Sequence, residues 1–213
     1  EGLKYEYIPR MAWSPKGELF FAMLNRHQDS MQVMTFTSGK APRRFLLETD
    51  AAYVESEREF SFLADGRLVW ASERSGFTHY YLYSADGSKS TPITSGTYDV
   101  TTFYGVDEVR GEAYYQAASR SASQREVFRT KLKGGKPTAI AATAPSNDAS
   151  FSSTFDYYVL TAQPAGEAAA GKAVKPATAT PPCADPGPFV WPAPATAAAN
   201  VPGGAARIVF SVM

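Results

Sequence analysis

The chain has 213 residues with 21 basic and 21 acidic side chains, so its zero formal charge gives no reason to expect nucleic acid or an anionic membrane as a partner. Its 44% hydrophobic and 13% aromatic residues are sufficient for a packed core. No stretch approaches the roughly 18 to 20 apolar residues of a membrane span, and the single cysteine, Cys183, excludes an intrachain disulfide and a multi-cysteine metal site.

A motif of strand, tight turn and strand recurs along the first three quarters of the chain. Its copies are Trp13–Phe21, Phe62–Trp70, the looser Val106–Tyr115, and Phe151–Leu160, which begins a fourth. The turn glycines are 49 residues apart between Gly17 and Gly66, and 45 apart between Gly66 and Gly111. Glycine supplies the positive φ that a hairpin turn needs.

Each hairpin is followed by a third strand that ends at another glycine turn. These segments are Met31–Lys40, His79–Ser88 and Glu126–Gly135. Their turn glycines, Gly39, Gly87 and Gly135, are spaced by 48 residues in both intervals. A short outer strand is expected after each turn, at Arg43–Leu47, Ser90–Ile93 and Pro137–Ile140. Each repeat therefore contains four strands.

Four antiparallel strands in 45 to 49 residues correspond to one blade of a β-propeller. A β-sandwich, the main alternative, predicts evenly spaced strands without this long period. We therefore predict an all-β fold for residues 1–162: an incomplete β-propeller of about three four-stranded antiparallel blades plus the start of a fourth. Propellers usually have about four to eight blades, so this number of blades is not expected to close a ring.

The composition changes after residue 162. Between Gln163 and Arg207, 15 Ala, 9 Pro and 5 Gly occupy 45 positions, which leaves few large apolar side chains to offset the entropy of ordering. We predict that residues 163–213 form a disordered, low-complexity tail without stable secondary structure up to Arg207.

The connections between the strands differ in length and composition. The turns within hairpins are short, which places them on one rim of the propeller. The longer connections, with Arg, Glu and Tyr side chains, gather on the other rim and are the expected place for contacts to a partner. They are Asn25–Ser30, Ser72–Thr78, Ala118–Arg125, Glu48–Glu57 and Thr94–Val100. Trp13, Trp70, Tyr81 and Tyr83 alternate along strands and are expected in the core.

Four segments carry a resemblance to a known family: Tyr7–Trp13, Leu24–Gln28, Ser72–Tyr83 and Ile93–Val100. Over Glu1–Thr161 the chain resembles the later blades of the dipeptidyl peptidase IV N-terminal propeller, in the prolyl oligopeptidase superfamily of serine peptidases. The resemblance implies an eight-bladed propeller above an α/β-hydrolase domain that removes dipeptides after a penultimate proline or alanine. In this family the propeller restricts access and holds the free amino terminus of the substrate.

The chain departs from this family in its catalytic parts. It contains no Gly-x-Ser-x-Gly motif, and its only histidines, His27 and His79, lie inside blades, so no Ser, Asp, His triad can be assembled. The paired glutamates that hold the substrate amine in this family have no equivalent before Tyr5. We therefore predict no catalytic residue, cofactor or metal site in this chain, and no activity of the chain alone.

The partners implied by the resemblance are the hydrolase domain of a full-length enzyme and its peptide substrate. Tyr53 and Glu55 lie on an inter-blade connection that, by resemblance, faces the active-site cavity. Glu73 and Arg74 either point toward the peptide or the hydrolase domain, or pair locally within their turn. Both histidines are expected to be hydrogen-bonded strand residues, because no cluster of metal-ligand spacing surrounds them.

Two other functions stay open at this point. A stand-alone propeller scaffold that binds a protein partner would need no hydrolase domain. A propeller enzyme that uses its central channel would need acidic residues there, and the innermost segments, Arg10–Trp13, Phe60–Leu63 and Thr101–Tyr104, contain none. The resemblance favours a periplasmic or secreted protein, but the start at Glu1 without a methionine suggests a processed or incomplete N-terminus and leaves the localisation open.

Overall fold

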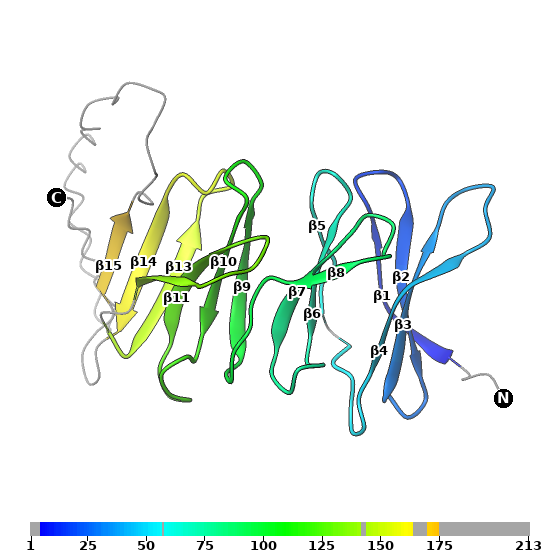
Figure 1. The fold of residues 1–213 in the computed structure, drawn as a ribbon, viewed down its shortest axis with the longest axis horizontal. Coiled ribbons are helices and arrows are strands. Elements are labelled where there is room, and N and C mark those ends of the chain that lie inside the picture. The colour runs from blue at the N-terminus through cyan, green and yellow to red at the C-terminus, as the bar shows by residue number, and fades with distance from the viewer. Residues whose placement is uncertain (1–4, 57, 142–143, 164–169, 175–213) are drawn as a thin grey trace, which may run out of the picture.

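Four antiparallel sheets follow one another along the chain and stand side by side in chain order (Figure 1). The structure is a computed structural model that describes residues 5–56, 58–141, 144–163 and 170–174. Within each sheet the strands pair in sequence order, so each connection between two strands of the same sheet is a hairpin. No crossover helix is needed. The prediction of an all-β fold built from antiparallel blades is confirmed.

The strand bounds match the predicted period. The first sheet contains β1 (Tyr5–Trp13), β2 (Leu19–Asn25), β3 (Ser30–Phe36) and β4 (Arg43–Thr49). The second contains β5 (Ser61–Phe62), β6 (Leu68–Ser72), β7 (His79–Tyr83) and β8 (Ser90–Pro92). The third contains β9 (Val100–Asp107), β10 (Glu112–Ala117), β11 (Glu126–Lys131) and β12 (Thr138–Ala141). The fourth contains β13 (Ser146–Phe151), β14 (Tyr158–Gln163) and β15 (Ala170–Val174).

The hairpin turns use glycine as the sequence predicts. Gly17 and Gly66 have φ angles of 74° and 86°, which lie in the left-handed region that other residues rarely adopt. The turns between β1 and β2 and between β5 and β6 lie on one rim, whereas the connections from β4 to β5 and from β6 to β7 lie on the opposite rim (Figure 1). The predicted separation of short and long connections is therefore present.

The fourth sheet extends further than predicted. β15 pairs with β14 from Ala162↔Ala170 to Tyr158↔Val174, so the prediction that no stable secondary structure follows residue 162 is wrong for Ala170–Val174. The existing edge of β14 offers backbone partners, so this short segment can pair there without a strong strand propensity of its own. The rest of the predicted tail, residues 175–213, lies outside the described residues.

The core lies between neighbouring sheets. The ring of Phe20 in the first sheet lies 4.9 Å, centroid to centroid, from the ring of Phe45 in the same sheet. It lies 4.8 Å from the ring of Phe62 in the second sheet. Leu63, Val69, Ala113 and Leu132 join the second and third sheets, and Val127, Ala149 and Tyr158 join the third and fourth. Every residue of β6 and of β10 is buried, because these strands have a neighbouring sheet on both faces.

The predicted aromatic core is correct for three residues and wrong for one. Trp70, Tyr81 and Tyr83 are buried, but Trp13 is 68% exposed. Trp13 pairs with Leu19, and the neighbouring pair Ala12↔Phe20 places its side chains toward the second sheet, so Trp13 points away from it. Alternation along β1 defines two faces of the strand, and Trp13 lies on the face that the second sheet does not cover.

The packing between sheets can be tested with two aromatic residues of the first sheet. We expect Phe20→Ala to lower the free energy of unfolding by about 3–5 kcal/mol, because it removes a fully buried ring. Trp13→Ala serves as the matched control and should change it by less than about 0.5 kcal/mol. Urea unfolding of both variants measures the difference, and equal losses would contradict the assignment of the two faces.

Candidate functional site

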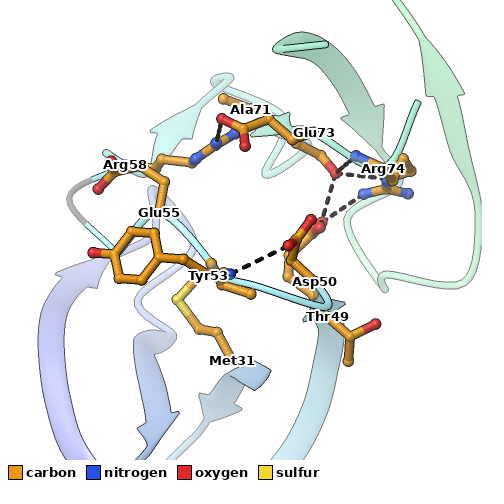
Figure 2. Close-up of a pocket in the computed structure, with 12 residues that line it drawn as sticks. Met31, Thr49, Asp50, Tyr53, Glu55, Arg58, Ala71, Glu73 and Arg74 are labelled. Atoms are coloured by element: carbon orange, nitrogen blue, oxygen red, sulfur yellow. Dashed lines mark hydrogen bonds and ion pairs between the residues drawn. The ribbon is translucent and has the colours of Figure 1, made fainter. Parts of the chain in front are cut away.

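The four candidate residues lie on two connections of the rim that carries the longer loops. Tyr53 and Glu55 follow β4, and Glu73 and Arg74 follow β6. Together with Met31, Glu48, Asp50 and Arg58 they line one cavity of about 20 Å³ between the first and second sheets (Figure 2). The cavity holds little more than one water molecule, so the site is a network of contacts and not a ligand pocket.

Glu48, the penultimate residue of β4, is the centre of this network. One carboxylate oxygen accepts hydrogen bonds from Trp70 Nε1 at 3.1 Å and from Arg74 Nη2 at 2.7 Å. The other accepts from Ser72 Oγ at 2.8 Å. The side chain of Glu48 is only 10% exposed, so these donors replace the water that its charge would otherwise require. The bonds join the first sheet to the second.

Arg74 is fixed within the second sheet. Its Nε donates to Ser72 Oγ at 2.8 Å, its Nη2 donates to the hydroxyl of Tyr83 at 2.5 Å, and its guanidinium lies 4.3 Å from the ring centroid of Tyr81. Burial acts to lower the pKa of Arg74, but the hydrogen bond to Tyr83 and the charge of Glu48 outweigh it, and the net shift of this pKa is upward. Arg74 therefore stays charged and supports the fold locally.

Glu73 joins its own turn to the preceding connection. It accepts from Arg58 Nη2 at 2.5 Å (Figure 2). It also accepts from Thr78 Oγ1 at 3.1 Å. The side chain of Arg58 is 11% exposed and that of Glu73 is 46% exposed, so the pair closes one side of the cavity. Neither charge pairs within its own turn: Glu73 pairs with Arg58 of the preceding connection, and Arg74 pairs with Glu48 of the first sheet.

The connection that carries Tyr53 and Glu55 is fixed by backbone contacts. Asp50 accepts hydrogen bonds from the backbone N–H groups of Ala52 at 2.7 Å and Tyr53 at 3.2 Å, and these bonds lower the pKa of Asp50. Val54 donates to the carbonyl of Gln28 at 2.8 Å and buries its side chain. The ring of Tyr53 remains 46% exposed, so this connection presents an aromatic surface in a defined conformation.

Glu48 and Arg58 were not identified from the sequence as members of this site. Glu48 is a carboxylate within a partly buried strand, and such a residue needs hydrogen-bond donors. The sequence does not show which donors these are, because they come from the next blade. Arg58 stands in a run of charged residues whose pattern does not distinguish it from its neighbours. Their roles depend on which connections of two successive blades lie side by side.

The histidines behave differently from each other. His79 is buried on β7 and its ring nitrogens lie 3.1 Å from Thr94 Oγ1 and 3.1 Å from the carbonyl of Gly96, as expected for a hydrogen-bonded strand residue. His27 is exposed in the turn between β2 and β3, so its predicted place in a strand is wrong. Among the described residues, no group of three or more His, Cys, Asp and Glu could hold a metal ion, and no helix is long and apolar enough to cross a membrane.

Antiparallel four-stranded sheets that pack face to face in chain order define this part of the chain as a segment of a β-propeller. Comparison with known proteins gives the family. Residues 2–167 match the model of the dipeptidyl peptidase IV (DPP IV) N-terminal region. The chain therefore belongs to this family.

Individual relatives agree with this assignment. The dipeptidyl peptidase 4 of Arthroderma otae is 26% identical over 166 residues, which cover 73% of this chain and 21% of that protein. The crystal structure of Porphyromonas gingivalis dipeptidyl peptidase 4 superposes with a TM-score of 0.73 at 33% identity, over 80% of this chain and 24% of that one. A putative dipeptidyl aminopeptidase IV from Bacteroides ovatus shares the fold, with a TM-score of 0.60 at 20% identity over 73% of this chain and 25% of that one. The chain spans about a fifth to a quarter of the length of these proteins.

The network around Glu48 makes a direct prediction. We expect Glu48→Ala to lower the free energy of unfolding by about 2–3 kcal/mol, because three donors lose their acceptor while Arg74 keeps partial access to water. Glu59→Ala removes an exposed carboxylate that is paired with Arg10, and this control should have little effect. Thermal or urea unfolding measures both, and similar values for the two variants would contradict the role of Glu48.

Proposed function

We propose that this chain is the non-catalytic propeller portion of a dipeptidyl peptidase IV-like serine peptidase, and that it acts by restricting the access of peptides and by supporting the hydrolase domain of that peptidase. The observation that carries the proposal is the match to the family over residues 2–167, which includes every complete blade. The absence of a nucleophile motif from the sequence supports a non-catalytic role.

The long-loop rim is the surface that suits such a role. Its connections are fixed to each other by Glu48, Arg58, Glu73 and Arg74, so they can bear a neighbouring domain without large rearrangement. We assign Glu73 and Arg74 to this support. Tyr53, which is half exposed, and Glu55 beside it remain the candidates for contact with the hydrolase domain or with the peptide.

A first test addresses the absence of catalysis. We expect the purified chain to release no product from fluorogenic Gly-Pro or Ala-Pro substrates, because acyl transfer requires a serine, a histidine and a carboxylate in one constellation, and loss of triad members lowers rates by about 10⁴ to 10⁶. Release above the buffer rate that survives repurification and disappears in His79→Ala would overturn this prediction.

A second test addresses the rim. Residues 5–163 would replace the matching blades of the P. gingivalis dipeptidyl peptidase 4, and the chimera would be assayed with short and long peptide substrates. If the rim restricts access, Tyr53→Ala and Glu55→Gln should change the ratio of kcat/KM values for long and short peptides by about threefold to tenfold, which corresponds to roughly 0.7–1.4 kcal/mol.

The matched control for the chimera is Val109→Ala, because Val109 is 96% exposed on the opposite rim, in the turn between β9 and β10. It should leave the ratio unchanged. A stand-alone scaffold is favoured instead if the chimera folds with a normal melting transition, and yet the ratio is the same in Tyr53→Ala, Glu55→Gln and Val109→Ala.

A further inference from the structure

A second cavity lies at the boundary between the second and third sheets, apart from the network around Glu48. It has a volume of about 360 Å³, within the range of small-molecule sites. The residues that line it include Arg58, Glu59, Ser61, Tyr80, Phe103 and Tyr104. They come from the connection after β4, from β5, and from the facing strands β7 and β9.

Arg58 stands between the two cavities and lines both. Its Nη2 donates to Glu73, whereas its Nη1 is buried and has no hydrogen-bond partner in the structure. An unpaired guanidinium N–H group is unfavourable in a place that water does not reach. It is also the group that best recognises a carboxylate, because a guanidinium presents its donors in a planar fork.

The same cavity has an aromatic wall. The rings of Tyr80 and Phe103 are stacked, with centroids 4.3 Å apart and planes at 15°. Burial raises the pKa of Tyr80, and the nearby positive charge of Arg58 only partly opposes this, so the phenol stays protonated and can donate a hydrogen bond. The wall therefore combines an apolar face with a second donor close to Arg58.

A β-bulge determines the direction of the next residue. β10 pairs Tyr115 with Phe103 and Tyr114 with Gly105, so Tyr104 is an extra residue in β9. Phe103 thus packs on Tyr80, while Tyr104 turns toward the fourth sheet and donates to Asp148 at 2.5 Å. The carboxylate of Asp148 is engaged by this bond and does not line the cavity.

The cavity contains one further charge. Glu59 lies at its edge, is 85% exposed, and pairs with Arg10 at 3.3 Å. Exposure screens its charge, so Glu59 opposes an anion in the cavity only weakly. Arg58, whose other side is paired with the half-exposed Glu73, is then the positive charge that a ligand would meet.

We propose that this cavity binds a carboxylate attached to an apolar or aromatic group, such as the C-terminal residue of a short peptide. The carboxylate is attracted by the guanidinium of Arg58 and accepts from the hydroxyl of Tyr80, and the apolar group lies against Phe103. The peptide nature of the ligand rests on the proposed function, whereas the preference for a carboxylate does not.

The test compares two probes that differ in one group. N-acetyl-phenylalanine and its amide would be titrated into the full chain, with binding followed by NMR chemical shifts or calorimetry. We expect the acid to bind at least about tenfold more tightly than the amide, because only the acid offers a charged acceptor to Arg58. Equal binding of the two probes, or no binding of the acid at millimolar concentration, overturns the proposal.

Two variants locate the site. Arg58→Gln should abolish the preference for the acid, whereas Arg67→Gln, at an arginine paired with Asp65 in the turn between β5 and β6, should preserve it. If Arg58→Gln does not fold, Phe103→Ala serves instead: it should weaken both probes and keep their ratio, because the charge is retained. An unchanged preference in folded Arg58→Gln, or unchanged binding in folded Phe103→Ala, contradicts the site. Neither result depends on the chimera, so this proposal and the proposed function fail separately.

Discussion

A four-stranded sheet has two faces and no interior, so every blade of this chain depends on the neighbour that covers it. The fully buried strands β6 and β10 show this constraint at its strongest, because both of their faces are covered. Phe20 and Trp70 fill the contact between the first and second sheets, and Tyr158 fills the contact between the third and fourth sheets. Hydrogen bonds between strands form each blade. The apolar contacts between neighbouring blades stabilise the blades against unfolding one by one.

Polar groups add direction to this contact. Apolar side chains alone would allow two sheets to slide with a small loss of free energy, whereas Glu48 accepts only from donors at defined positions, on Trp70, Ser72 and Arg74. The network lies at the rim, where the apolar core ends and the connections begin. It therefore couples the packing of the sheets to the conformation of the loops, and Tyr53 is presented in one orientation because the residues below it are fixed.

The sequence was sufficient for the blades and insufficient for the contacts between them. Repeated glycine turns and strand lengths are local properties, so the period predicted nearly all of the strands. Trp13 was misplaced because alternation defines two faces of a strand but does not identify the covered one. β15 was missed because its pairing depends on the edge of β14. Of the candidate site, the connection carrying Tyr53 was recognised by its length, whereas Arg58 joined the site only through the packing of successive blades.

The outward faces of the first and fourth sheets differ in chemistry, and this difference limits what can cover them. On the first sheet, Met11 and Trp13 are 63% and 68% exposed and project from the face opposite the second sheet. On the fourth, Asp148 and Thr161 form an exposed pair beside Ser150, with Val159 as the apolar exception. Water is a poor solvent for the first surface and a good one for the second. Since an apolar face is stabilised by an apolar partner and a polar face must be matched by hydrogen bonds, the two ends are poorly complementary to each other. Asp148 already accepts a hydrogen bond from Tyr104 of the third sheet, so a surface that covers the fourth sheet has to match Ser150 and Thr161, whereas a surface that covers the first sheet has to be apolar to match Met11 and Trp13.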